Sequence, residues 1–216
     1  MKNIQLEVTR LIDNNIAVRK LLKEDLINVR ALARKFLKEY QLDCSIEAVI
    51  SAIRRYEAGR KETDYLPIIY KMLKKAKLST RMKLSSILLR KNQYVREKLP
   101  RIFSLVDFEG GDTLRIFEVS KYIKIILEEK LITSIKKIFR DSDIVLIEDN
   151  LSELDIFYDV DITKTPGVFA TLSNELAANN ISIVDSMICY NEHIIIVLEK
   201  DTQQAFNVLF ALIRKN

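Results

Sequence analysis

The sequence contains few of the residue types that build metal sites and disulfide frameworks. Among its 216 residues there is one histidine, His193, and there are two cysteines, Cys44 and Cys189, which lie far apart in the chain. Because no Cys/His cluster with metal-ligand spacing occurs, no metal site is expected. The two cysteines are interpreted as buried free thiols, and His193, which opens an apolar run, is expected to face solvent or a partner.

Long apolar runs are missing as well. No run of eighteen apolar residues occurs, and residues 1–7 lack the apolar segment of a signal peptide. The sequence also shows no Ser/His/Asp set and no phosphate-binding loop, and its acidic residues are scattered. We therefore expect a cytoplasmic protein that has no membrane partner, requires no cofactor and is not an enzyme.

The composition is that of a globular protein, with 48% hydrophobic and 30% charged residues, and the length allows two or three modules. The net charge of +5 is unevenly distributed. Residues 1–100 carry 23 Lys and Arg against 11 Asp and Glu, whereas residues 101–216 carry 12 against 19. The basic half suggests a polyanionic partner for that half alone, and the alternative is an ordinary solvated Lys/Arg surface.

Residues 1–78 are expected to form an all-α domain. Two of its helices have clear capping residues, Asn28 and Ser45, directly before their apolar stripes. From apolar spacing, helices are predicted over residues 3–13, 17–23, 29–40, 46–56 and 65–77.

The third and fourth of these helices resemble a helix-turn-helix, because "LINVRALARKF" and "SIEAVISAIRRY" are short, amphipathic and consecutive. The connection over residues 37–44 is longer than in the compact motif and has no turn glycine. The motif implies DNA contacts from side chains outside the apolar stripes: Ser51, Arg54, Arg55, Arg30 and Arg34. A helical bundle used for docking or dimerisation is the alternative.

An internal repeat marks the C-terminal part of the chain. Residues 122–139 align without gaps on residues 193–210, and each copy is predicted to be a strand followed by an amphipathic helix. Identical pairs in this alignment are Ile123/Ile194, Ile125/Ile196, Leu127/Leu198, Glu128/Glu199 and Phe139/Phe210. Further strands are predicted over residues 81–90, 113–119, 144–148, 154–162 and 181–184, and further helices over residues 93–106 and 168–178.

These elements describe an α+β fold in which the helical domain precedes two ferredoxin-like units of the plan βαββαβ, residues 79–150 and 151–216. The second unit lacks its last strand, so residues 154–162 are expected to form an open edge. A strand of the first unit, or the same edge of a second chain, could fill it. We therefore expect a dimer through the sheets.

One stretch of the second unit, Thr163–Asp185, combines a Pro-Gly turn with an amphipathic helix and a β-branched run, "TKTPGVFATLSNELAANNISIVD". Pro166 suits the first turn of a helix, and Gly167 lets another group approach the backbone closely. The stretch resembles the opening of an ACT domain, a small regulatory module that binds amino acids. The first unit has Asn92 and no glycine in this place, so its loop is expected to bind nothing.

The resemblance implies an amino-acid site between paired ACT units, in which backbone amides of the loop bind the carboxylate. The residues that it implies are Asp161, Thr163, Lys164, Thr165, Gly167 and Val168, joined by Asp185 and Ser186 on the next strand. An ACT unit used only for dimerisation is the alternative.

As a whole, the sequence resembles archaeal ACT-domain proteins that are regarded as regulators of amino-acid metabolism. The resemblance implies an amino-acid-responsive transcriptional regulator, in which the effector changes the spacing of two DNA-binding modules in a dimer. The alternative is a sensory or adaptor protein that regulates a metabolic enzyme by protein–protein contact.

Overall fold

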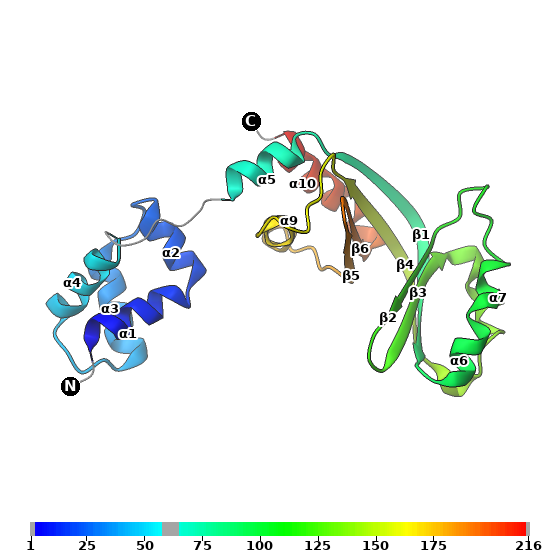
Figure 1. Ribbon diagram of the computed structural model, residues 1–216, viewed down its shortest axis with the longest axis horizontal. Helices are drawn as coiled ribbons and strands as arrows, with labels where there is room; N and C mark the ends of the chain where they lie inside the picture. The colour runs from blue at the N-terminus through cyan, green and yellow to red at the C-terminus, as the bar shows by residue number, and fades with distance from the viewer. Residues whose placement is uncertain (1–2, 58–64, 215–216) are drawn as a thin grey trace. The chain divides into compact units, whose positions relative to one another are not determined.

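The computed structural model describes residues 3–57 and 65–214. The chain divides into two compact units, residues 1–63 and 64–216. The first unit is helical and the second is built on an antiparallel sheet (Figure 1), which confirms the expected α+β class. The division falls before helix α5 (Leu66–Leu73), whereas the sequence placed it after residue 78, because α5 packs into the core of the second unit.

Residues 3–57 form four α-helices around one apolar core. They are α1 (Ile4–Asp13), α2 (Ile16–Lys23), α3 (Val29–Tyr40) and α4 (Ile46–Glu57). The predicted caps are confirmed, since Asn28 Oδ1 accepts from Ala31 N at 3.0 Å and Ser45 Oγ accepts from Ala48 N at 3.2 Å. After α3, Gln41 adopts a left-handed conformation with φ of 49°, so the chain turns there without a glycine.

Residues 65–214 form six strands together with helices. The strands are β1 (Lys77–Arg90), β2 (Leu114–Glu118), β3 (Tyr122–Glu128), β4 (Ile144–Phe157), β5 (Asp185–Cys189) and β6 (Glu192–Leu198). The α-helices are α5, α6 (Gln93–Lys98), α7 (Pro100–Phe103), α8 (Ile132–Lys136), α9 (Val168–Ala178) and α10 (Thr202–Arg214), with short 3₁₀ turns before α8, β4 and α10. The helix predicted over residues 93–106 is therefore divided, because Pro100 removes a backbone donor.

Two long strands, β1 and β4, run through the whole second unit. The strand order is β2-β3-β1-β4-β6-β5, and Leu84 of β1 pairs directly with Leu151 of β4 at the centre. Figure 1 shows both strands as long bent ribbons with α5, α9 and α10 at one end and α6 and α7 at the other. Lys83 and Asn150 have positive φ beside this centre, where the register also shifts. The separate strands predicted over residues 144–148 and 154–162 are thus one strand, which ends at Phe157.

The edge that the sequence left open is covered by the same chain. Residues 77–81 of β1 pair with residues 153–157 of β4 in antiparallel register. The helix predicted over residues 65–77 ends at Leu73, and residues 77–80 extend β1 ahead of its predicted start. Of the two fillers that the sequence allowed, a strand from the first half of the sheet is the one observed. This edge therefore no longer argues for pairing with a second chain.

The repeat exists, but its structural register differs by one residue from the sequence alignment. Ile87 and Leu154 are equivalent, because each lies three residues after one member of the Leu84–Leu151 pair. Ile87 pairs with Ile125 and Leu154 pairs with Ile195, so Ile125 corresponds to Ile195. The alignment had matched Ile125 with Ile196, which faces the opposite side of the sheet. A shift of one residue moves every side chain of a strand to the other face of the sheet. Because both copies contain several isoleucines, the shifted alignment also matches apolar residues with apolar residues.

Three apolar clusters hold the second unit together. One lies between the β4–β6 half and α5, α9 and α10, and another between the β1–β3 half and α6, α7 and α8. A smaller cluster lies on the opposite face and includes Leu84, Ile126 and Leu151. On that face Arg115 of β2 binds Glu153 at 2.9 Å, and Lys124 of β3 pairs with Asp185 of β5. These ion pairs join strands from both halves, so the sheet is curled.

Because β1 and β4 belong to both halves, we expect the two halves to lose their structure together. Replacing the fully buried Leu84 by Ala should lower the free energy of opening by about 2–5 kcal/mol for amides of β3 and β6 alike. Native-state hydrogen exchange measures this. Leu146→Ala, at a side chain that is 48% exposed, is the matched control. Loss of protection in β3 alone would contradict the coupling.

Candidate functional site

The loop between β4 and α9, residues 158–167, is attached to the turn between β5 and β6. Tyr158 N donates to Asn191 O at 2.8 Å, and Ile162 N donates to Tyr190 O at 3.0 Å. Asn191 Nδ2 donates back to Tyr158 O at 2.9 Å. These bonds place the loop and the start of α9 beside the end of edge strand β5.

Asp161 organises the middle of this loop. Its Oδ1 accepts from Thr163 N at 2.9 Å and from Thr163 Oγ1 at 2.5 Å, and its Oδ2 lies 3.7 Å from Lys164 Nζ. The hydrogen bond from the Thr163 hydroxyl is the largest of the effects that lower the pKa of Asp161. The carboxylate is therefore ionised and holds the turn, while the Lys164 side chain remains 88% exposed.

Gly167 begins α9 and leaves its N-terminus open. The first amides of a helix have no partner inside the helix, and a glycine cap has no side chain to bind them. Gly167 has φ of 92°, and a Cβ built there would lie 3.4 Å from Ile69 Cδ1 of α5. Its backbone thus needs glycine, and the open amides form a positive pole that suits a carboxylate.

The corresponding helix of the other half is closed by its own chain. Asn92 Oδ1 accepts from Val95 N at 2.9 Å and so caps α6. Asn92 Nδ2 also donates to the buried Asp143 at 2.7 Å, and Arg140 binds the same carboxylate at 2.6 Å. Arg140 in turn lies 4.1 Å from the centre of the Tyr94 ring. The two halves therefore differ at this place: α6 has a side-chain cap and α9 has none.

The other residues implied by the sequence are placed in different ways. Thr165 N donates to Ile162 O at 3.1 Å, within the turn. The side chain of Val168 is buried in the core, so only its backbone can face a ligand. Asp185 and Ser186 are neighbours in β5 and face opposite sides of the sheet. Asp185 pairs with Lys124 on the face without helices, whereas Ser186 lies on the side of α9.

His193 is part of this site, and the expectation that it faces solvent or a partner is wrong. Its side chain is fully buried on β6. Its Nε2 lies 2.9 Å from Ser186 Oγ, its ring centre lies 5.7 Å from that of Phe169 in the first turn of α9, and its Nδ1 has no partner among the described residues. Burial lowers the pKa of His193 to about 4, so the ring is neutral at pH 7.

Sequence reasoning also missed an apolar wall beside the loop. Phe169 of α9, Ile188 of β5 and Tyr190 of the following turn are 44%, 39% and 62% exposed. Ile188 pairs with His193, which contacts Phe169, and the backbone oxygen of Tyr190 accepts a hydrogen bond from Ile162 N of the loop. The alternation of Ser186 with Ile188 on an edge strand was the available signal, but residues 181–184 were predicted as the strand instead.

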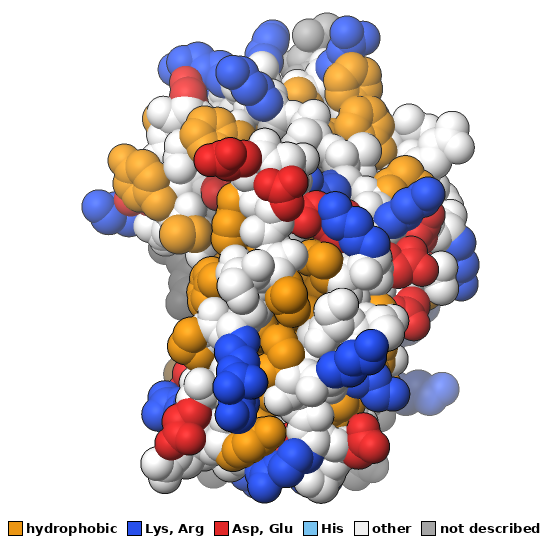
Figure 2. Space-filling view, turned by 90° about the vertical axis from the view of Figure 1, so that its right-hand side faces the viewer, with side chains coloured by type: hydrophobic (Ala, Val, Ile, Leu, Met, Phe, Trp, Pro, Cys, Tyr) orange, Lys and Arg blue, Asp and Glu red, His pale blue; other side chains and the backbone are white. Residues whose placement is uncertain are grey.

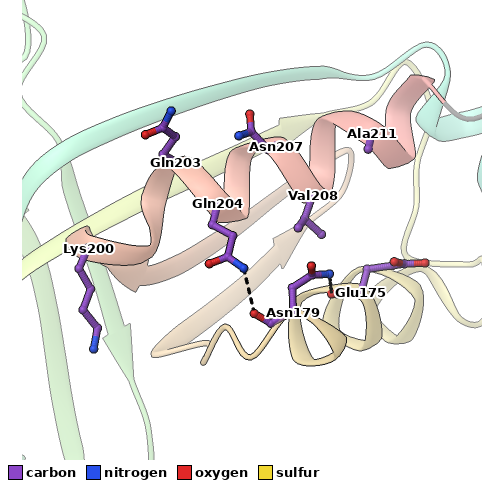
Figure 3. Close-up of a pocket in the computed structure, with 8 residues that line it drawn as sticks. All are labelled: Glu175, Asn179, Lys200, Gln203, Gln204, Asn207, Val208 and Ala211. Atoms are coloured by element: carbon purple, nitrogen blue, oxygen red, sulfur yellow. Dashed lines mark hydrogen bonds between the residues drawn. The ribbon is translucent and has the colours of Figure 1, made fainter.

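A separate groove of about 640 Å³ lies between α9 and α10 (Figure 3). It adjoins the far end of α9, where Gln204 Nε2 donates to Asn179 O at 3.2 Å and Asn179 Nδ2 donates to Glu175 O at 2.8 Å. The lining residues are Glu175, Asn179, Lys200, Gln203, Gln204, Asn207, Val208 and Ala211. The groove is thus distinct from the loop site.

The candidate DNA-binding residues lie on the surface of the first unit. Ser51, Arg54 and Arg55 are exposed on α4, and Arg30 and Arg34 are exposed on α3. Arg55 Nε donates to Ser51 O at 3.3 Å.

On the α6–α7 side of the second unit, Figure 2 shows Lys and Arg side chains next to Asp and Glu side chains, with apolar side chains between them. The charged groups there have mixed signs.

Other expected features concern metals, membranes and thiols. Within residues 3–57 and 65–214, no group of three or more His, Cys, Asp or Glu side chains could hold a metal ion. None of the helices in the same ranges is long and apolar enough to cross a membrane. The expectation of two buried thiols is wrong for Cys189, which is exposed at the end of β5, while Cys44 is half-buried.

The second unit thus has a curled antiparallel sheet, with an open helix N-terminus beside an edge strand. Residues 157–210, which contain the loop, α9, β5, β6 and most of α10, match the family model of the ACT domain. Over these residues, about a quarter of the chain, the sequence is thus similar to the ACT domain. Among curated proteins, none matches.

Solved structures with a similar fold include aspartate kinases and one of their regulatory subunits. Aspartate kinase from Clostridium acetobutylicum has a TM-score of 0.52 at 15% identity, over 64% of this chain and 34% of that enzyme. The enzyme from Synechocystis has a TM-score of 0.52 at 14% identity, over 64% and 27%. The regulatory subunit from Thermus flavus has a TM-score of 0.52 at 10% identity, over 62% and 95%. At these identities the likeness shows the fold alone, and this chain corresponds to about a third or less of each whole enzyme.

The buried state of His193 can be measured directly, because the chain has a single histidine. We expect its imidazole carbon-bound protons to titrate in NMR with a pKa of about 4, since burial disfavours the charged ring. The unfolded chain, with a pKa of about 6.5, binds the proton first as the pH falls. His193 should thus destabilise the fold progressively between about pH 6.5 and 4, by up to roughly 3 kcal/mol.

Burial raises the pKa of Asp155 to about 6, so Asp155 contributes with the opposite sign in an overlapping range. The contribution of His193 is therefore obtained from the difference in unfolding free energy between the natural chain and His193→Gln. A histidine that titrates near 6.5 would place the ring in water and contradict its position.

Proposed function

We propose that the protein is an amino-acid-responsive regulator and that its effector binds at the loop between β4 and α9. The observation that supports this most strongly is the uncapped N-terminus of α9 inside the part of the chain that matches the ACT domain. ACT domains bind amino-acid effectors, and the similar aspartate-kinase structures include a regulatory subunit. The effector carboxylate lies at the amides of α9, and its ammonium group lies toward Asp161.

We also propose that the second unit consists of two ACT-type halves that share β1 and β4. The sheet order supports this, because β2-β3-β1-β4 and β1-β4-β6-β5 both follow the strand order of the ferredoxin-like plan. In this proposal the first half is a degenerate unit and only the second binds the effector. A homodimer through the sheets uses the edge strands β2 and β5.

The effector site predicts a stability change on ligand binding. An amino acid present at about a hundred times its dissociation constant should raise the free energy of unfolding by about 2.7 kcal/mol. A thermal-shift screen of the twenty amino acids detects this. Gly167→Ala should abolish the shift, because a Cβ at φ of 92° strains the cap and turns the loop amides.

Gly111→Ala is the matched control for Gly167→Ala. Gly111 has φ of 87°, so it carries a similar strain of about 1–3 kcal/mol, but a Cβ there meets nothing within 4 Å. This variant should keep the ligand-dependent shift. If none of the amino acids stabilises the natural chain at millimolar concentration, the ACT domain serves as a scaffold and the proposal is wrong.

For the first unit we propose DNA binding, which would make the protein a transcriptional regulator. The exposed Arg54 and Arg55, consecutive on α4, favour this, and residues 1–63 carry 13 Lys and Arg against 9 Asp and Glu. The alternative is an adaptor that contacts a metabolic enzyme through the same helices. Arginines bind phosphates and acidic protein surfaces alike, so the partner has to be identified by experiment.

The DNA hypothesis predicts a salt-dependent gel shift. Replacing Arg54 and Arg55 together by Ala should weaken binding and reduce the slope of log affinity against log salt by about two. The control is the double variant Lys20→Ala/Lys23→Ala, which removes the same charge from exposed positions of α2. If the natural chain does not bind DNA even at low salt, the adaptor hypothesis replaces this one.

A further inference from the structure

We propose that the effector is an amino acid with an uncharged, apolar side chain, branched aliphatic or aromatic, which packs against Phe169, Ile188 and Tyr190. This inference rests on the proposed function and adds the class of effector. It follows from the position of this apolar wall, from the charges around it and from the way the first half of the sheet fills the equivalent place.

The wall adjoins the amides that would hold the carboxylate. Phe169 belongs to the first turn of α9, two residues after Gly167, and its ring lies over His193 with the centres 5.7 Å apart. Ile188 pairs with His193 across β5 and β6, and so lies on the same face of the sheet. Tyr190 O accepts from Ile162 N at 3.0 Å, which fixes the β5–β6 turn against the loop.

The three side chains remain accessible although they are large and apolar. They are 44%, 39% and 62% exposed, in the order Phe169, Ile188 and Tyr190. A ligand side chain that covers them removes apolar surface from water, which favours binding. An amino acid held by its carboxylate at the start of α9 has its side chain within reach of this wall.

The charged side chains of the loop are Asp159, Asp161 and Lys164, and both carboxylates already have partners. Asp161 binds Thr163 and lies near Lys164, and Asp159 pairs with Lys75 at 3.1 Å. Toward β5, the polar groups on the α9 side are the Ser186 hydroxyl and the neutral ring of His193. Placed against Phe169 and Ile188, a charged ligand side chain would lose water without gaining a counter-ion, so charged amino acids are disfavoured.

The first half of the sheet shows what a closed version of this place looks like. Ile188 pairs with His193, and Glu118 pairs with Ile123. His193 and Ile123 occupy equivalent positions in the two halves, so Ile188 corresponds to Glu118. Glu118 is charged and binds Lys91 at 2.7 Å and Arg96 at 2.5 Å. Together with the Asn92 cap, these contacts fill the first site from within the chain. The second site has an open helix end and an apolar wall instead.

The test measures binding of amino acids to the full chain by calorimetry. Leucine, isoleucine, valine, methionine and phenylalanine are compared with aspartate, glutamate, lysine and arginine. We expect at least one of the apolar set to bind at least tenfold more tightly than every member of the charged set. Phe169→Ala should weaken that binding about tenfold, as for loss of several methylene contacts, and Ile188→Asp should weaken it further.

The matched control is Phe103→Ala. Phe103 is 52% exposed on α7 in the first half, so this change removes a similar exposed ring away from the proposed site. Binding should stay within twofold of the natural chain. Circular dichroism melting of each variant verifies that the fold persists.

The outcomes separate this inference from the proposed function. If charged amino acids bind, the apolar ones do not, and Gly167→Ala abolishes binding, the effector class is wrong while the effector site stands. If no amino acid binds, the proposed function fails, and this inference with it. If instead Phe169→Ala converts a dimer to a monomer in light scattering and changes no ligand affinity, the wall is covered by a second copy of the chain and the inference is overturned.

Discussion

The pairing of β1 with β4 is the constraint on which the second unit depends. Both strands are long enough to serve two halves of the sheet, and Leu84 and Leu151 meet where one half passes into the other. Each strand has a residue with positive φ beside this point, which lets the ladder continue while the sheet bends. The same pairing covers residues 153–157, and it orients both helix layers against the sheet.

The two halves have similar plans but opposite chemistry at their first helix. In the first half, Asn92 caps α6, and Glu118 is held by Lys91 and Arg96, so the polar groups satisfy one another. In the second half, the cap is Gly167, and the position of Glu118 is taken by Ile188. A helix end without a side-chain cap leaves backbone N–H groups without a partner inside the helix. This asymmetry is the main argument that the second half binds a ligand.

Local patterns predicted much of the fold and part of the site. The caps Asn28 and Ser45 and the extent of α9 followed from short stretches of sequence, because a helix depends on contacts three or four residues apart. The turn at Gly167 was recognisable for the same reason. His193 was misplaced, because a polar residue at the start of a strand is usually exposed, and its burial depends on Phe169 from another element.

The amino-acid sequence was enough to predict the α+β class, the helical character of the first unit, the presence of a repeat and the Pro-Gly loop in the part of the chain that is similar to the ACT domain. All of these depend on residue types and spacing within one element or motif. The folded sheet was needed to establish three further features. Residues 77–81 cover the edge of β4, the repeat has a register one residue away from the alignment, and Asp185 and Ser186 face opposite sides of the sheet. Strand pairing joins residues far apart in the chain, and alternating apolar residues are compatible with more than one partner and register, so packing of the whole sheet makes that choice.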